Sequence, residues 1–547
     1  MPRLDATVVA PWHSPAKADT KDGDAAVVSS ASANGLEKAT LLDSTNINPS
    51  PAMAKTPCAS SNSVQQQVTG HTDEHYGRIS MQVPVWAGVA LRVFIVLLRP
   101  DWGTMLAGRV EVSTPVTSFK RLNECIYLHT HDIPPYDGGV CHQAPLLVTL
   151  FQYIPSFATP FVFILTDYII ARLFVSIAEY KRTLQLAEVW PEAVKVDDDV
   201  PATSTPVDEM GTGVGQVDTE ADKVEIEAHT SAGSWHDPNE KHHTIWHDDP
   251  TKPVDALIVP EDVGSLYMFN PYAIIICLAK STQSFSSLGI LAAIHFAIHG
   301  HIGMTVLSLA TATYLSLYPV IFFPLCILLL VSSRKESILK ISLKGIALFI
   351  VAIGVLLFSS FLLFGDWKFL ESTYGTIIFV TDLTPNIGLY WYFFIEMFDQ
   401  FRTFFLVVFH ITTIIFTMPV TLRFNKHPLF VAFMLAGFSA LFKSYPSIAD
   451  TALFLSLSAI YPEVFKYARN MFFAITALAY ATLLGPLFFN LWVYSGAGNA
   501  NFFYAITLVF SLALVIYLVD LSFAMLRREW ERLHPGWRRM RYEVGQI

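Results

Sequence analysis

The sequence predicts an all-α polytopic membrane protein with about twelve transmembrane helices. Hydrophobic residues make up 52% of the 547 residues, whereas charged residues make up only 15%. Long apolar stretches alternate with short polar connectors, several of which carry Lys and Arg. A soluble chain of this length would form several separate domains and carry far more charge. The composition therefore excludes a set of soluble domains.

Two segments differ from the apolar remainder of the chain. The first 80 residues are rich in Ala, Ser, Thr, Asp and Gln and poor in aromatic residues, which predicts a disordered tail. Between positions 191 and 262, 18 acidic residues stand against 4 lysines, a local balance of −14. Such a segment cannot form a core, so we interpret it as an inserted loop. The net charge of −10 comes largely from this insertion.

The first apolar stretch, Pro84 to Leu98, is short for a membrane span and contains Arg92. A charged side chain at this depth is expected to be paired or to face the protein interior. Further spans are predicted around 161–178, 345–364, 471–489 and 502–526, with shorter apolar stretches between them.

Clusters of Lys and Arg predict the orientation of the spans, because cytosolic connectors carry the excess of basic residues. These clusters lie at 181–182, 334–344, 423–426, 466–469 and 527–541. Placing them on one side leaves both termini cytosolic. The connectors rich in other polar residues then converge on the lumenal side, where they predict a site at the membrane boundary. These connectors are residues 101–144, 364–386, 443–450 and 494–501.

The predicted domain organisation follows from this orientation. It consists of a disordered cytosolic tail (1–80), first transmembrane segments (81–188) with a lumenal loop (101–144), an acidic disordered cytosolic insertion (189–262), a multi-helix transmembrane core (263–526) and a basic cytosolic tail (527–547).

A polar turn at 382–388 leads directly into an aromatic helix. Asp382, Thr384 and Asn386 form either an Asx-type turn that bonds to its own backbone or a binding surface. Trp391 and Tyr392 follow, and a lipid-facing aromatic belt is favoured over a dedicated acyl groove. Glu396 and Asp399 come next on the same predicted helix, and we expect them to pair with Arg402.

Two other lumenal connectors offer candidate binding residues. Lys443, which precedes Tyr445, either meets phosphate groups or extends to the membrane surface as an interfacial lysine. Asn499 and Asn501 either offer hydrogen bonds to a ligand or form a Gly/Asn turn between helices.

The five cysteines form no CxxC motif and no metal-ligand spacing. Cys125 and Cys141 share the loop at 101–144 and are either a disulfide or two free thiols. Three histidines in the same loop raise the alternative of a Cys/His catalytic pair, but nothing there marks an activated thiolate. The histidines between positions 236 and 247 suggest a metal site only weakly, because their surroundings are expected to be disordered.

Several stretches together resemble the PIG-U family, the multispan subunits of the glycosylphosphatidylinositol (GPI) transamidase of the endoplasmic reticulum. They are RVEVSTPVTSFKR (109–121), PYDGGVCHQAPLL (135–147), NPYAIIICLAKST (270–282), LATATYLSLYP (309–319), DLTPNIGLYWYFFIEMF (382–398), FKSYPSIADTAL (442–453), SGAGNANFFYAITL (495–508) and AMLRREW (524–530).

The resemblance implies a non-catalytic subunit that binds or presents the GPI lipid and scaffolds the complex, with no cofactor. Its expected partners are the GPI lipid, membrane lipids and the other subunits, among them a Cys-protease-like catalytic subunit; nucleic acid is not expected. The residues expected to contact GPI or a partner are Asp382, Thr384, Asn386, Trp391, Tyr392, Lys443, Tyr445, Asn499 and Asn501. No catalytic residue and no metal ligand are expected.

The family is also similar to the membrane glycosyltransferases that include the GPI mannosyltransferases, which implies a related scaffold with lumenal loops forming the site. A dolichol-phosphate-sugar-dependent mannosyltransferase is therefore the rival function. Such an enzyme needs a carboxylate to activate the acceptor hydroxyl or to hold a cation beside the phosphate. The corresponding stretch here has Glu111 followed by Val, Ser, Thr and Pro, and lacks an acidic pair.

Overall fold

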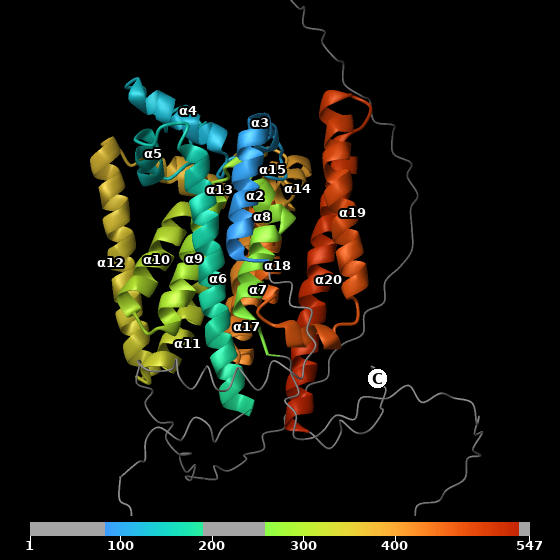
Figure 1. The fold of residues 1–547 in the computed structure, drawn as a ribbon. Coiled ribbons are helices and arrows are strands. Elements are labelled where there is room, and N and C mark those ends of the chain that lie inside the picture. Colours follow the sequence, from blue (N-terminus) through green and yellow to red (C-terminus); the bar gives the residue numbers. More distant parts are fainter. Residues whose placement is uncertain (1–82, 190–256, 535–547) are drawn as a thin grey trace, which may run out of the picture. The chain divides into compact units, whose positions relative to one another are not determined.

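The computed structural model describes residues 83–189 and 257–534, and within these ranges every regular element is a helix (Figure 1). The predicted cytosolic tail, most of the acidic insertion, its histidines and the last arginines lie outside the described residues. The all-α class is thus confirmed for the part of the chain that is described.

Five helical segments are long and apolar enough to cross a membrane by themselves. They are Thr159–Leu186, Ile338–Phe364, Asp399–Arg423, Met471–Tyr494 and Ala500–Leu533. A sixth span is possible if α7 (Pro260–Phe269) and α8 (Pro271–Ala279) count as one, although they bend by 55°. The bend falls at Asn270-Pro271, because Pro cannot continue the hydrogen-bond ladder of the preceding helix. The expected twelve spans stay a prediction.

Six shorter apolar helices of 10–17 residues complete the set of candidates. They are α2 (Val85–Leu98), α9 (Gln283–Ile298), α10 (Ile302–Ser316), the Tyr318–Arg334 segment made of η1 (Tyr318–Phe322) and α11 (Phe323–Arg334), α17 (Pro428–Phe442) and α18 (Ile448–Ser458).

The remaining bounds are as follows. The long helices are α6 (Thr159–Val189), α12 (Ile338–Phe364), α15 (Asp399–Ile415), α19 (Met471–Phe489) and α20 (Ala500–Leu533). The short α16 (Thr417–Arg423) follows α15, and the short η4 (Asn490–Tyr494) follows α19. The other short ones are α3 (Pro100–Ala107), α4 (Phe119–Thr130), α5 (Pro145–Gln152), η2 (Leu370–Gly375), α13 (Thr376–Phe379), α14 (Tyr390–Glu396) and η3 (Pro462–Tyr467).

The segment at 101–144, expected to be a loop, contains α4 and most of α3. Ser118 caps α4, because its side chain accepts a hydrogen bond from the backbone N–H of Arg121. Phe119, Leu122 and Cys125 form one buried face of this helix. The apolar spacing within a polar sequence thus produces an amphipathic helix that lies on the helical core.

The core is made by helices that are apolar on nearly every side. α17 and α18 have buried residues on every side. α9 packs against α10, and α19 packs against α20. By contrast, only 6% of the most apolar window of α12 is buried. This helix therefore presents an apolar surface along its length to the surrounding lipid or to another protein.

Arg92 is fully buried and pairs with Asp167 of α6 at 2.9 Å. Its Nη1 also donates to the carbonyl oxygen of Met268 at 2.6 Å, and the hydroxyl of Tyr267 donates to Asp167 at 3.1 Å. The expectation that Arg92 is paired and faces inward is confirmed. The pair joins α2, α6 and α7 in the interior.

Candidate functional site

The polar connectors that were expected to converge do meet at one end of the helices. The backbone N–H of Ile448 donates to the carbonyl oxygen of Glu111 at 3.1 Å. The hydroxyl of Tyr445 donates to the backbone carbonyl oxygen of Asp382 at 2.8 Å. Tyr392 donates to the side chain of Asn501. We call the region formed by residues 109–144, 370–392, 443–450 and 490–504 the polar end. Its placement on the lumenal side stays a prediction.

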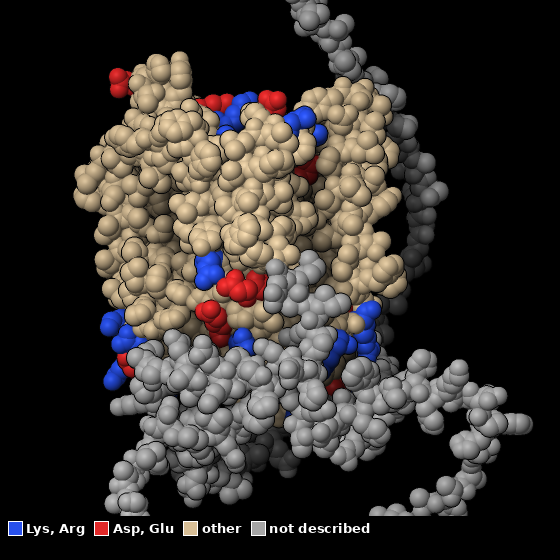
Figure 2. All heavy atoms as spheres, viewed as in Figure 1, with Lys and Arg blue, Asp and Glu red and all other residues tan. Residues whose placement is uncertain are grey.

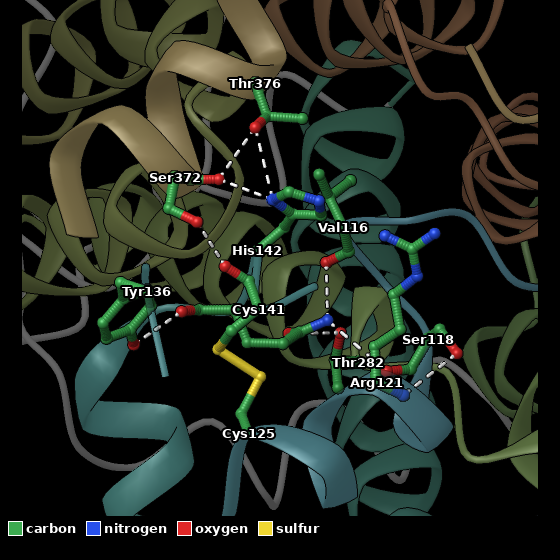
Figure 3. The surroundings of a disulfide bond; sticks show 11 residues. Val116, Ser118, Arg121, Cys125, Tyr136, Cys141, His142, Thr282, Ser372 and Thr376 are labelled. Atoms are coloured by element: carbon green, nitrogen blue, oxygen red, sulfur yellow. Dashed lines mark hydrogen bonds between the residues drawn. A yellow bond between two sulfur atoms is a disulfide. The ribbon is translucent and has the colours of Figure 1, made fainter. Parts of the chain in front are cut away.

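Cys125 and Cys141 form a disulfide, which resolves the two alternatives for this pair (Figure 3). The disulfide joins the middle of α4 to the irregular segment that precedes α5. The carbonyl oxygen of Cys141 accepts a hydrogen bond from Ser372 at 2.6 Å, so η2 is attached to the same point. Neither sulfur is available as a thiolate in this state, which argues against the Cys/His pair considered for this loop.

Asp382 connects three of the converging segments. Its Oδ2 lies 2.8 Å from the guanidinium of Arg121 on α4 and 3.9 Å from Nε2 of His142. Its Oδ1 accepts a hydrogen bond from the backbone N–H of Thr384 at 2.9 Å and another from the Thr384 hydroxyl. Asp382 is therefore at once the first residue of an Asx turn, as the sequence indicated, and an ion-pair partner of a distant helix.

The electrostatic surroundings of Asp382 favour its charged form. Burial alone would raise the pKa of Asp382, but the two hydrogen bonds from Thr384 and the positive charge of Arg121 outweigh burial and lower it below its usual value. His142 differs, because burial is the main cause that lowers the pKa of its imidazole, and the charge of Arg121 adds to it. The neutral ring donates from Nδ1 to the carbonyl oxygen of Ser372 at 2.7 Å (Figure 3).

Asn386 is fully buried and uses its side chain within the turn. Its Oδ1 accepts from the backbone N–H of Gly388 at 2.7 Å, and its Nδ2 donates to the carbonyl oxygen of Thr384 at 3.3 Å. Gly388 in turn packs so closely on Pro446 that an added Cβ would lie 2.6 Å from the Pro446 ring. Asn386 thus shapes the turn from within and does not reach the surface.

Lys443 forms a buried ion pair, which contradicts its interpretation as an interfacial lysine extended to the membrane surface. Its side chain is 2% exposed, and Nζ lies 3.2 Å from Oδ1 of Asp450. Asp450 also accepts from Gln283 at 3.0 Å and closes the capping box with Ser447 at the start of α18. The ring centre of Tyr318 lies 5.9 Å from Nζ, and Asp450 replaces the solvent as the partner of the charge. Tyr445 is buried as well.

Trp391 is 1% exposed, so its interpretation as a lipid-facing belt residue is wrong. Its ring lies within 6.0 Å, between ring centres, of the rings of Tyr392, Trp492, Phe503 and Tyr504. Tyr392 stacks on Tyr504 at 4.5 Å and remains partly exposed. The aromatic residues of α14 therefore join this helix to η4 and the start of α20.

The expected pairing of Glu396 and Asp399 with Arg402 is not formed. Arg402 instead donates to the carbonyl oxygen of Val380 at 2.8 Å, with weaker contacts to Phe379 and Phe394. A break in the predicted helix separates Glu396 from Arg402, since α14 ends at Glu396 and α15 begins at Asp399 after the extended residue Phe398. Asp399 does lie on α15 with Arg402, but the guanidinium is directed to backbone carbonyl oxygens instead. Glu396 and Asp399 are both exposed.

Asn499 and Asn501 are the predicted site residues that the structure exposes most clearly. Asn499 caps α20, since its side chain accepts from the backbone N–H of Phe502 at 3.3 Å, as expected for a turn between helices. Asn501 lies beside Tyr392. Thr384 is partly exposed, like Asp382. Among the predicted residues, Asn499 and Asn501 are thus exposed, Asp382, Thr384 and Tyr392 are partly exposed, and Asn386, Trp391, Lys443 and Tyr445 are buried. We call Tyr392, Asn499 and Asn501 the rim and the four buried residues the support.

Sequence reasoning did not name Arg121 and Tyr504 as members of this region, and it considered His142 only for a Cys/His pair. It also gave little weight to Glu111, whose two carboxylate oxygens are buried without a hydrogen-bond partner among the described residues. Burial raises the pKa of Glu111. An added Cβ at Gly485 would lie 3.7 Å from its Oε1, so the carboxylate faces α19. These residues could not be recognised from the sequence, because no local sequence pattern indicates contacts between connectors that are far apart along the chain.

The long apolar helices, the buried ion pairs and the polar end define a polytopic α-helical membrane protein whose connectors form one joined surface. A family model, described as the GPI transamidase subunit PIG-U, matches residues 86–510. The chain belongs to the PIG-U family.

Curated relatives match the chain over most of its length. The GPI-anchor transamidase component PIGU of Cricetulus griseus is 32% identical over 455 residues, which cover 82% of this chain and 94% of that protein. The Homo sapiens protein of the same name is 32% identical over 454 residues, with the same shares covered. The GPI transamidase component GAB1 of Saccharomyces cerevisiae is 30% identical, covering 82% of this chain and 95% of its own length.

Proposed function

We propose that this chain is a non-catalytic subunit of the GPI transamidase that binds and presents the GPI lipid and scaffolds the complex. The names of its relatives, which are GPI transamidase components, support the assignment to this complex. The complex lies in the endoplasmic reticulum membrane, where the chain crosses several times and keeps both termini cytosolic. Its partners are the other subunits, including the Cys-protease-like catalytic subunit.

The cysteine chemistry supports a non-catalytic role. Cys125 and Cys141 are joined, and the free thiols of Cys277 and Cys326 are both buried, Cys277 beside the Arg92–Asp167 pair. A thiol nucleophile needs access to its substrate and a base that produces the thiolate. None of these four sulfurs meets both needs, and this supports the proposal that another subunit cleaves the precursor; Cys58 lies outside the described residues.

The observation that carries the lipid-binding proposal is the division of the polar end into rim and support. A GPI head group offers sugar hydroxyls and phosphates, which amide side chains and tyrosine hydroxyls can bind by hydrogen bonds. Asn499 and Asn501 expose such groups, and the partly exposed Tyr392 stacks on the ring of Tyr504. The buried ion pair of Lys443 and Asp450 joins the two ends of the 443–450 connector.

Depletion of the chain followed by lipid and protein analysis tests this function. We expect complete GPI to accumulate while precursor proteins keep their C-terminal signal, because synthesis of the anchor continues and its attachment fails. Accumulation of an under-mannosylated GPI intermediate would contradict the proposal and favour the transferase.

The mannosyltransferase remains the second candidate because of one observation, the buried and unpartnered carboxylate of Glu111. A carboxylate with a raised pKa can serve as a general base or acid. A Glu111→Gln variant keeps the shape and removes that chemistry. Normal anchor attachment by this variant supports the subunit, whereas accumulation of a truncated glycan supports the transferase.

A further inference from the structure

A groove with a volume of about 490 Å³ lies between the start of α10, the end of α11 and the first half of α12. It is at the opposite end of α10 from the polar end, because Tyr318, just after α10, bonds to Ser444. The groove is therefore separate from the rim proposed to bind GPI.

Three basic side chains line the groove, namely His301, Arg334 and Lys344. Arg334 is held in place, since its Nη1 donates to the carbonyl oxygen of Gly300 at 3.2 Å and its Nε to Glu336 at 2.8 Å. Glu336 is the acid that faces this group, and it offsets one of the positive charges. Figure 2 shows Lys and Arg side chains gathered at the lower left edge, where α11 and α12 meet in Figure 1. The groove therefore has a net positive charge at its mouth.

The opposite wall of the groove is apolar and is formed by Met304, Leu307 and Leu348. Each of these side chains is more than a third exposed. Leu348 follows Lys344 by one helical turn, a rise of about 6 Å along α12. From there the apolar wall continues along the same face of α12, where Val351 and Val355 are 61% and 58% exposed. Charge and apolar surface thus follow one another along the axis of a membrane helix.

The bottom of the groove has room for a head group. At Gly303, an added Cβ would meet no atom within 4 Å, so the first turn of α10 is open to the groove. The first residue before α10, His301, makes no capping hydrogen bond with its side chain. The imidazole, the guanidinium and the ammonium group therefore surround a space that is not filled by the described part of the chain.

We propose that this groove binds one anionic phospholipid, with its phosphate among His301, Arg334 and Lys344 and an acyl chain along Leu307 and Leu348. The charge fits a phosphodiester, and basic pockets between membrane helices bind anionic head groups in this way. The apolar wall can contact an acyl chain, whereas a soluble phosphate would make no favourable contact with it. A bound lipid also covers part of α12, which the other helices leave exposed.

The test uses the full chain, purified in detergent after incubation with phosphatidylserine or phosphatidylcholine, and counts the retained lipid by native mass spectrometry. We expect retention of phosphatidylserine above phosphatidylcholine, and a loss of roughly five-fold in Lys344→Gln, since one basic residue contributes about that factor. Lys340→Gln is the matched control, because Lys340 is an exposed lysine one turn earlier on α12 and does not line the groove.

A second variant separates a built site from general surface charge. Gly303→Leu fills the groove and leaves every charge in place, and the open space around Gly303 allows it to fold. We expect this variant to lose phosphatidylserine as Lys344→Gln does. Equal retention of the two lipids, or an unchanged Gly303→Leu variant, would overturn the proposal. Displacement of the lipid by inorganic phosphate alone would also overturn it, because the occupant would then be a soluble anion.

Discussion

Two turns at the polar end both contain Asn and Gly, but their asparagines differ in burial. The turn at 382–388 contains Asn386, which is fully buried and bonds within the turn. The turn at 495–501 ends with Asn501, which is exposed beside Tyr392. Both contain Asn and Gly, so composition alone gives them the same function. The difference in burial is the reason why we propose a supporting role for the first turn and contact with a ligand for the second.

The largest effect is expected from breaking the ion pair beneath the first turn. Lys443→Met should destabilise the protein by about 3–5 kcal/mol, because it leaves the buried Asp450 without its positive partner. Thermal unfolding of the purified chain measures this effect, with the exposed Lys426→Met as the control. Equal stability of the two variants would contradict the buried support.

A pair of glycine variants compares the turns directly. Gly388→Ala should cost about 1–3 kcal/mol, because the new Cβ would lie 2.6 Å from Pro446 and a core must shift to admit it. Gly496→Ala should cost about 1 kcal/mol, since its φ of 62° is strained for Ala while no atom lies within 4 Å. A larger loss for Gly496→Ala than for Gly388→Ala in the same unfolding measurement would reverse the comparison.

Lowering the pH should reduce the free energy of unfolding through the buried His142 of the polar end. Because the pKa of His142 is lowered, the folded state favours its neutral form, so this stability is fully present above about pH 6.5 and falls as the pH drops below it. A shift of one pKa unit corresponds to about 1.4 kcal/mol. Unfolding midpoints between about pH 6.5 and pH 5 measure the effect. His142→Asn, which can still donate toward Ser372, should lack this dependence, and an identical pH profile would refute the assignment.

The smallest effect on stability is expected on the exposed side. Asn501→Ala should change the free energy of unfolding by less than about 0.5 kcal/mol, as surface substitutions usually do. It should nevertheless impair attachment of GPI to a reporter protein. Asn470→Ala, an exposed Asn at the other end of α19, serves as the control. Unimpaired attachment with Asn501→Ala would remove this residue from the site.

The helices and the convergence of the connectors could be predicted from the sequence. The length of each apolar stretch and the positions of Lys and Arg are properties of short sequence segments and need no knowledge of tertiary contacts. The Asx turn at Asp382 was equally local, since its partner lies two residues away. The partners of Arg92 and Asp382 could not be predicted, as Asp167 and Arg121 lie far from them in the sequence.

Two wrong interpretations show where local patterns fail. The spacing of Asp399 and Arg402 suits an ion pair, and both lie on α15, but Arg402 donates to the carbonyl oxygen of Val380 instead. A run of aromatic residues at a membrane edge suits an interfacial belt, but Trp391 packs against rings from η4 and α20. In each case a tertiary contact replaced the local one.

Photo-crosslinking tests the central claim most directly, namely that the exposed rim at Asn501 contacts the GPI lipid. A photoreactive residue is placed at position 501 of the full chain within the complex, and in separate samples at positions 386 and 470. We predict crosslinked GPI at 501 and none at 470, with little at the buried position 386. Crosslinking at 470 equal to that at 501, or none at 501 in an active complex, would contradict the account.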